Sequence, residues 1–326
     1  MSARGGIDSS NAGVPTRGVW ISDPDGALGR RVVAALGACD GMVVGGAGEA
    51  DVAVWLAGHD ATVGDAWQGA RFRPIDDLLA WSPGPAHVVL VSSALVYGAW
   101  ANNPVPLTED TALRPDADLA LGFVALEQSV DEWRRAEEAR SATVLRPAVT
   151  VAADQPGGLA SALVAGMGQR LGEDDPPSQF LHLDDLAAAI VLAVTERLDG
   201  VFNVAPHGSI PGDRVRALTG SVPRVRLPTR VHDVVGGLRW RFERGPIPAG
   251  MTGYTRFPWI VANDRLVAAG WVPTVTNEQA YVEATEAPWW TMVSPERRQE
   301  LALGAAATAV GSVVFGVVRA VRRSTR

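Results

Sequence analysis

The stretch that most constrains this chain is residues 19–36, VWISDPDGALGRRVVAAL. A short apolar run is followed by turn-forming residues and then by apolar residues at helical spacing, which predicts a strand, a tight turn and a helix. A unit of this kind opens the nucleotide-binding α/β folds, where the turn and the amino end of the helix hold a pyrophosphate. We therefore predict an α/β protein with a doubly wound parallel sheet.

The turn departs from the usual phosphate-binding pattern. On the spacing G-x-x-G-x-x-G its three positions are Asp23, Gly26 and Gly29. Glycine lets the backbone approach a pyrophosphate, whereas a carboxylate at the first position repels the phosphates and fills that space. We expect Asp23, Gly26, Leu28 and Gly29 to line a dinucleotide site whose affinity is weak or lost.

The region after the second predicted strand is short. Residues 41–46 (GMVVGG) read as that strand, and only residues 47–50 separate it from the next, residues 51–58 (DVAVWLAG). Dinucleotide sites place an acidic or basic side chain at the end of the second strand, against the adenosine ribose. The one candidate is Glu49, and a surface turn residue is the commoner role for such a glutamate. We expect the adenine side of the site to be reduced.

Composition excludes several classes of protein. The net charge is −7, so no general affinity for nucleic acid is expected. The single cysteine, Cys39, excludes a disulfide framework and a cysteine-rich metal site, and we expect no metal and a cytoplasmic location. All 29 basic residues are arginines, so the chain contains no lysine.

The remaining pattern alternates strands and helices. Residues 87–98 read as a buried parallel strand that contains Ser92 and Ser93, and residues 143–152 as another that Arg146 and Pro147 close. Helices are predicted over residues 118–133, 157–171 and 180–194, and a last strand over residues 200–205.

Eight short motifs then occur in one order along the chain. They are the Gly26/Gly29 turn, DVAVWLA at 51–57, SSALVYG at 92–98, LTED at 107–110, LRP at 145–147, HLDDL at 182–186, GVFNV at 200–204 and AGWVP at 269–273. In these motifs the chain resembles the extended short-chain dehydrogenase/reductase family of the NAD-dependent epimerase/dehydratase type.

The resemblance implies a domain organisation. It implies a Rossmann-like NAD(P)-binding-type domain over residues 17–206 and a smaller substrate-type domain over residues 207–294. To these we add a disordered tail over residues 1–16 and an apolar and basic helix over residues 295–326.

The resemblance also implies site residues. The family transfers hydride to or from NAD(P) with a Tyr-x-x-x-Lys pair and a serine, and Ser93 stands at the serine position. Counting back from Glu127, the tyrosine and lysine positions fall on Leu119 and Phe123, and no shift of register restores the pair in a chain without lysine. By the same resemblance the cofactor would also meet Leu56, Ala57, Ser92 and Pro147.

Other candidates have ordinary structural explanations. His59 and Asp60 follow a predicted strand, where ligands of such sheets bind, but a solvated loop pair is the commoner case. His182 with Asp184 and Asp185 has a metal-like composition, yet capping of a helix fits better. Tryptophan-rich stretches at 239–241, 257–259 and 289–290 suit either stacking on a sugar or lipid headgroup or packing of the smaller domain.

Residues 301–318 form an uncharged run of 18 residues with arginines on both sides. This length lies at the lower limit for a membrane span, and Gly304, Thr308, Ser312 and Gly316 recur every fourth residue, a spacing that packs helices in bilayers. The segment 301–326 either crosses the membrane, lies in its interface, or docks on the globular body. We expect association with the inner face of a bacterial cell membrane or with a membrane protein.

Two functions remain open from sequence. The first is a catalytically degenerate family member, a pseudoenzyme that acts as a binding or scaffold protein at the membrane face, with a homo-oligomer as a further option. The second is an active NAD(P)-dependent epimerase, dehydratase or reductase of a nucleotide sugar or lipid-linked substrate that uses a different acid. The missing tyrosine–lysine pair favours the first.

Overall fold

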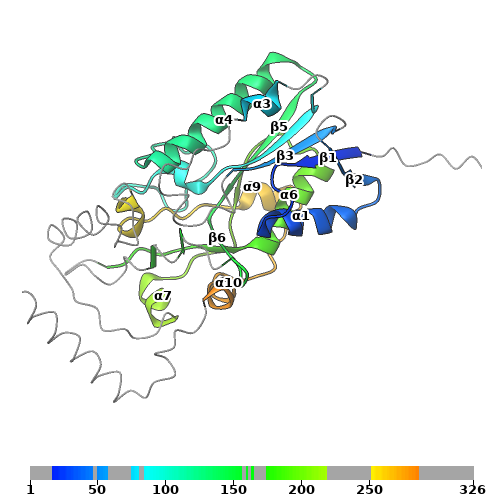
Figure 1. Ribbon diagram of the computed structural model, residues 1–326. Coiled ribbons are helices and arrows are strands. Elements are labelled where there is room, and N and C mark those ends of the chain that lie inside the picture. The colour runs from blue at the N-terminus through cyan, green and yellow to red at the C-terminus, as the bar shows by residue number, and fades with distance from the viewer. Residues whose placement is uncertain are drawn as a thin grey trace, which may run out of the picture.

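The structure is a computed structural model, and it describes residues 17–46, 50–57, 75–80, 84–155, 159–160, 163–164, 174–218 and 251–285. A parallel sheet forms its centre, with helices on both faces (Figure 1). The doubly wound α/β architecture predicted from the sequence is thus confirmed. The expected tail over 1–16, Glu49, His59, Asp60, the tryptophans at 240, 289 and 290, and the segment 295–326 lie outside the described residues.

The central sheet has six parallel strands in the order β2-β1-β3-β4-β5-β8. The strands are β1 (Arg17–Ile21), β2 (Met42–Val44), β3 (Val52–Leu56), β4 (His87–Val91), β5 (Ser141–Pro147) and β8 (Gly200–Val204). The chain passes from β1 outward to β2 and then back across β1 to β3. The strand order therefore reverses between β1 and β3, which is where open α/β sheets bind ligands at their carboxyl edge.

Two pairs of helices cover the faces of this sheet. Helices α1 (Ala27–Gly37) and α6 (Leu183–Thr195) pack against each other on one face, and α4 (Asp118–Ala136) with the short α3 (Asp76–Leu79) lies on the other (Figure 1). Every residue of β3 and β4 is buried between the two layers. This burial explains their unbroken apolar runs, which are typical of parallel sheets.

Smaller elements complete the fold. A second, two-stranded sheet pairs β6 (Val149–Val151) with β7 (Phe180–His182). The other elements are the 3-10 helices η2 (Ala94–Tyr97) and η4 (Gly253–Thr255) and the helices α7 (Gly212–Leu218), α9 (Asp264–Ala268) and α10 (Asn277–Ala284). Helix α10 packs on β7, and α9 packs on β8 at the edge of the large sheet.

Three sequence-based boundaries need correction. The run 87–98 is a strand only to Val91, and its apolar end forms η2 instead. The run 143–152 is two strands, because the chain leaves the large sheet at Ala148 and enters the small one. The first three residues of 180–194 are β7 and not helix. In each case a buried apolar run does not reveal where a strand ends or whether the next residues form a turn, a second strand or a helix.

The described residues end at Thr285, before the apolar segment 301–318. Among the helices that are described, none combines the length and apolar character that a membrane span requires.

Candidate functional site

The turn between β1 and α1 is closely packed. An ideal Cβ on Gly29 would lie 1.8 Å from the carbonyl oxygen of Asp23, so only glycine allows this approach of helix and turn. The Ser22 hydroxyl accepts a hydrogen bond from the Leu56 backbone N–H (2.9 Å), which joins β1 and β3 at the carboxyl edge. Gly26 is the N-cap of α1 and provides no side-chain cap. Gly29 therefore has a packing role that does not require a cofactor.

The charges of this turn are unfavourable for a pyrophosphate. Asp23 and Asp25 flank Pro24, which has no backbone N–H to donate. The guanidinium of Arg30 donates a hydrogen bond to the Asp25 carbonyl and so places one positive charge at the turn. Two carboxylates against one guanidinium still leave the turn acidic at neutral pH.

Strand β2 stops before it reaches the cofactor edge. Val44, its last residue, pairs with Val19, whereas β1 continues two residues further, to Ile21. After β2 the chain carries Gly45 and Gly46, which have no side chain for a ribose. Residues 47–49, which include the candidate Glu49, lie outside the described residues, so the reduced adenine side stays a prediction.

The other predicted cofactor positions lie at the carboxyl ends of β3, β4 and β5. Leu56, Ala57, Ser92 and Pro147 are all buried there. Ser93 is buried as well, and its hydroxyl accepts a hydrogen bond from the Leu95 backbone N–H (3.3 Å) as the cap of η2. The structure therefore gives Ser93 a structural hydrogen bond.

Leu119 and Phe123, where the sequence predicts the family's tyrosine and lysine positions, lie on α4. Phe123 is 5% exposed and belongs to the hydrophobic core, and Leu119 is partly buried and packs against it. Neither side chain can transfer a proton or hydrogen-bond a ribose.

The three tyrosines of the chain are all buried. Tyr97 is 1% exposed, and its hydroxyl donates to the Asn203 side chain (2.8 Å). Tyr254 is 1% exposed and its hydroxyl donates to the Leu95 carbonyl (2.6 Å), while Tyr281 is 4% exposed and packs on Phe180. Burial raises the pKa of both Tyr97 and Tyr254, which makes them poorer acids.

A buried polar network lies just below the carboxyl edge of the sheet, and sequence patterns alone did not predict it. Glu127 on α4 accepts two hydrogen bonds from the Arg146 guanidinium (3.0 and 2.6 Å) and one from the Ser92 hydroxyl (2.6 Å). Arg146 also donates to the Tyr97 hydroxyl (2.9 Å), and Tyr97 continues to Asn203 on β8. The one sequence feature that could have pointed to this network is Arg146, a charged residue inside the otherwise apolar strand that ends with LRP at 145–147. The network joins α4, β4, β5 and β8.

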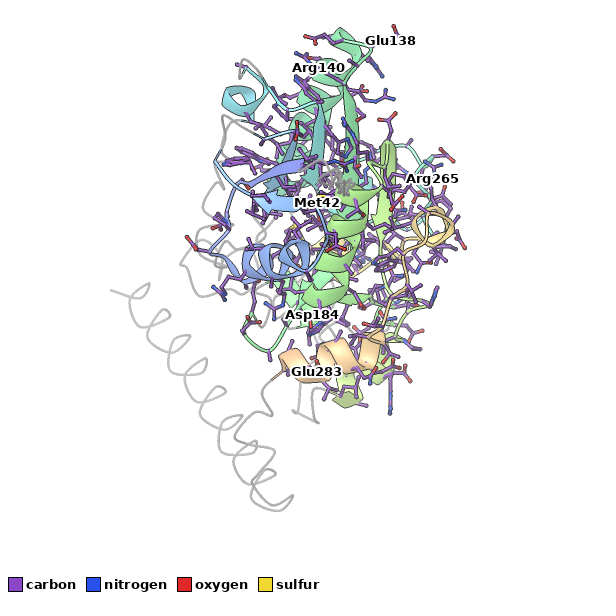
Figure 2. All side chains as sticks on the ribbon, turned by 90° about the vertical axis from the view of Figure 1, so that its right-hand side faces the viewer. Met42, Glu138, Arg140, Asp184, Arg265 and Glu283 are labelled. Carbon is purple, nitrogen blue, oxygen red and sulfur yellow. The ribbon has the colours of Figure 1, made fainter. Side chains whose placement is uncertain are left out.

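The HLDD segment is structural. The His182 imidazole accepts a hydrogen bond from the Asp184 backbone N–H (3.2 Å) and so caps α6, as the capping interpretation predicted. Its other ring nitrogen lies 3.4 Å from Glu283 on α10, and Figure 2 places Asp184 and Glu283 at the same end of the molecule. Asp185 accepts hydrogen bonds from the backbone N–H groups of Thr274 and Val275. Within the described part of the chain no three His, Cys, Asp or Glu side chains are grouped to hold a metal ion.

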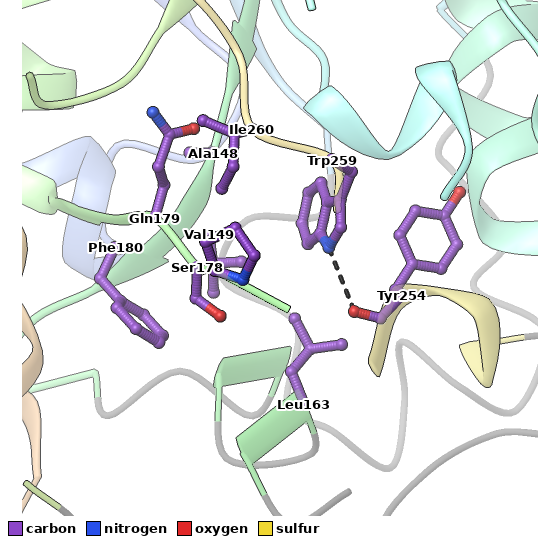
Figure 3. Close-up of a pocket in the computed structure, with 10 residues that line it drawn as sticks. Ala148, Val149, Leu163, Ser178, Gln179, Phe180, Tyr254, Trp259 and Ile260 are labelled. Atoms are coloured by element: carbon purple, nitrogen blue, oxygen red, sulfur yellow. Dashed lines mark hydrogen bonds between the residues drawn. The ribbon is translucent and has the colours of Figure 1, made fainter. Parts of the chain in front are cut away.

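A small pocket opens beside β5, about where the chain passes from the large sheet to the small one (Figure 3). It encloses about 10 Å³, room for about one water molecule, and the rest of the hollow is open to solvent. Its apolar walls are Val149, Leu163, Phe180, Tyr254, Trp259 and Ile260. The ring of Trp259 meets that of Tyr254 edge to face, with centroids 5.2 Å apart. None of the cofactor positions predicted from the sequence lines this pocket.

The fold is that of a Rossmann-like α/β protein, with its candidate site at the carboxyl edge of the sheet. Comparison with known structures agrees: RMD from Pseudomonas aeruginosa complexed with NADPH is 18% identical, with a TM-score of 0.60 over 85% of this chain and 100% of that one. Thermus thermophilus UDP-glucose 4-epimerase in complex with NAD is 15% identical, with a TM-score of 0.59 over 82% and 97%. A human epimerase family protein with NADPH is 17% identical, with a TM-score of 0.54 over 82% and 98%. No curated protein sequence matched the chain.

The model of the NAD dependent epimerase/dehydratase family matches residues 26–205. The chain therefore belongs to that family, as its motifs had indicated. The match begins at Gly26, after Asp23, Pro24 and Asp25.

Proposed function

We propose that this chain is a non-catalytic member of the epimerase/dehydratase family that keeps the fold as a binding protein and has lost hydride transfer. One observation carries the proposal: the chain has no lysine, and its three tyrosines are all buried within the protein core. A positioned acid or base contributes about 10²–10⁴ in rate, so a family member without the pair lacks its main proton donor.

The cofactor site supports the same conclusion. Asp23 and Asp25 give the phosphate turn negative charge, and Gly45 and Gly46 replace a ribose-binding side chain. We propose that NAD(P) binding is weak or lost, with dissociation constants above roughly 1 mM for NAD⁺, NADH, NADP⁺ and NADPH.

The test is a titration of the full chain with each of the four dinucleotides by calorimetry, with tryptophan fluorescence as a second readout. Binding of any one at micromolar concentration would overturn the proposal. In the Asp23→Gly variant the affinity should rise if the carboxylate is the main obstacle. If Asp23→Gly changes nothing, the missing ribose contact after β2 accounts for the weak binding.

The place of action is a second part of the proposal. We propose that residues 301–326 bring the protein to the inner membrane face, directly or through a membrane protein. Arginines 319, 322, 323 and 326 would meet anionic lipid at about 1 kcal/mol each if the segment lies in the interface. Fractionation of the full chain against a chain ending at Glu300 tests this, because equal solubility of the two without detergent or high salt would contradict it.

A further inference from the structure

One segment of the chain lies against the residues that follow β4 and β5, where open α/β sheets bind their ligands. It comprises residues 254–262, from Tyr254 in η4 to Ala262, and we call it the strap. We propose that the strap closes the ligand side of the sheet with its own side chains and opens as a unit while the sheet stays folded. The inference goes beyond the proposed function, because it holds whether or not a dinucleotide binds at β1 and β3.

Two side chains of the strap fill the space at these strand ends. Tyr254 is 1% exposed, and its hydroxyl donates a hydrogen bond to the carbonyl of Leu95 in η2, shortly after β4. Trp259 packs edge to face on Tyr254 and lines the hollow of Figure 3 together with Ala148, which directly follows β5. The hollow encloses about 10 Å³, so no ligand larger than about one water molecule fits inside it while the strap is closed.

Hydrogen bonds attach the strap on both sides of these strand ends. On one side, Leu107, in the loop between η2 and α4, donates its backbone N–H to Ile260 and accepts that of Ala262 (2.7 and 2.8 Å). On the other side, the Gln179 side chain next to β7 hydrogen-bonds the backbone N–H and carbonyl of Val261 (2.9 and 3.1 Å). The strap therefore connects the loop after η2 to the start of the small sheet.

These attachments are fewer than those that hold the large sheet. Val261 meets Leu107 in an isolated bridge, and the strap is a strand of neither sheet. Residues 256–259 are half-buried, whereas every residue of β4 is buried. Segments with few ladder hydrogen bonds and partly exposed side chains open at a lower free energy than the core of a domain. The strap should therefore open before β4 and β5 unfold.

Hydrogen exchange of the full chain, followed by NMR in urea below the unfolding transition, tests the opening. The backbone amides of Leu107 and Ala262 report on the strap, and the amide of Ser92, which donates to the Leu145 carbonyl (2.8 Å), reports on the sheet. We expect the strap amides to exchange faster than Ser92, with a urea dependence below about half that of Ser92, because opening the strap exposes less surface than unfolding. Equal rates with equal urea dependence would overturn the proposal.

Two buried tyrosines provide a matched pair of variants. Tyr254 and Tyr97 are each 1% exposed, but Tyr254 belongs to the strap, whereas Tyr97 belongs to the polar network of the sheet through Asn203 (2.8 Å). Tyr254→Phe removes one hydrogen bond of the strap and should speed exchange of the strap amides about two- to tenfold. Tyr97→Phe should speed exchange of the Ser92 amide and leave the strap amides unchanged. Faster exchange of the strap amides in Tyr97→Phe would show that strap and sheet open together, which contradicts the proposal.

A cysteine beneath the strap tests the closure. Val149 in β6 lines the hollow and is 3% exposed. In a chain with Val149→Cys and with Cys39→Ser, which removes the native thiol, a thiol reagent reaches residue 149 only when the strap opens. Adding Tyr254→Phe should speed labelling by the same two- to tenfold, and adding Tyr97→Phe should not. Labelling at the rate of an exposed thiol would show that the strap does not close this edge. Micromolar binding of a dinucleotide would overturn the proposed function and leave the strap unaffected.

Discussion

The two halves of the central sheet differ in how firmly they are built. On the phosphate-turn side, β2 has three residues, pairs with only the first part of β1, and leaves Val43 51% exposed. On the other side, a polar network joins α4 to strands that are largely buried, and its members are Ser92, Tyr97, Glu127, Arg146 and Asn203. The edge strand β8 is also covered, because the Glu109 carboxylate accepts the Asn203 backbone N–H (2.9 Å).

This difference distinguishes residues that the fold needs for stability from residues that a cofactor site would need for binding and catalysis. The residues that hold β4, β5, β8 and α4 together are hydrogen-bonded to one another, whereas the positions at which the family resemblance predicts dinucleotide contacts carry Asp23, Leu119 and Phe123. A buried ion pair must stay complete, because one partner left alone in the core is strongly destabilising. A cofactor contact carries no such penalty when it is lost.

The largest effect is expected from breaking the network. Arg146→Met leaves the Glu127 carboxylate buried without its partner, and should lower the free energy of unfolding by about 3–5 kcal/mol. Urea denaturation measures this. The matched control is Arg135→Met on the exposed side of α4, where the ion pair with Asp131 should contribute less than about 0.5 kcal/mol.

The double variant Arg146→Met with Glu127→Leu sharpens the result. It removes both charges and should recover part of the lost stability. If Arg146→Met alone costs less than about 1 kcal/mol, the network is not what holds this half of the sheet together.

His87, at the start of β4, should make this half sensitive to acid. It is fully buried between Ser141 and Thr143 of β5, and burial together with nearby Arg197 lowers its pKa from 6.5 to about 4. The folded state therefore favours the neutral imidazole. Stability is highest above pH 6.5 and falls as the pH drops from 6.5 toward 4, by about 3 kcal/mol at the lower end.

The measurement is urea denaturation of the unaltered chain and of His87→Gln at pH 7 and pH 4. The variant should lose about 3 kcal/mol less than the unaltered chain over this interval, since both share the same carboxylates. Parallel losses in the two proteins would assign the acid sensitivity to other groups.

A smaller effect is expected in the phosphate turn. Gly29→Ala places a Cβ against the Asp23 carbonyl, so α1 must move, and the free energy of unfolding should fall by about 1–3 kcal/mol. Gly45→Ala, after β2, meets no atom within 4 Å and should change stability by less than about 0.5 kcal/mol. Equal effects of the two substitutions on thermal unfolding would show that the turn is not tightly packed.

No gain in activity is expected when the catalytic pair is rebuilt. Leu119→Tyr with Phe123→Lys restores the two side chains on α4, but the phosphate turn and the end of β2 remain altered. Hydride transfer to NAD⁺ from a nucleotide sugar, followed by absorbance of NADH, should stay at background, with folding checked by circular dichroism. Turnover in this variant would show that the cofactor cleft is intact.

The sequence by itself determined the fold class, the order of most strands and helices, and the family. Apolar runs that alternate with helical patterns can be recognised from the local order of residue types, as in β3, β4 and α4. The sequence also excludes a Tyr-x-x-x-Lys pair, because a chain without lysine cannot form one however it folds.

Only the tertiary structure decided where each run changes its role and which polar groups meet. Ala148 separates two sheets inside one apolar run, and the hydrogen bond that Arg146 donates to Glu127 joins residues 19 positions apart on a strand and a helix. The pocket likewise brings Val149 and Trp259 together from distant segments. Such contacts depend on how the helices and strands pack in three dimensions. A local pattern of residue types does not determine which distant segments come together.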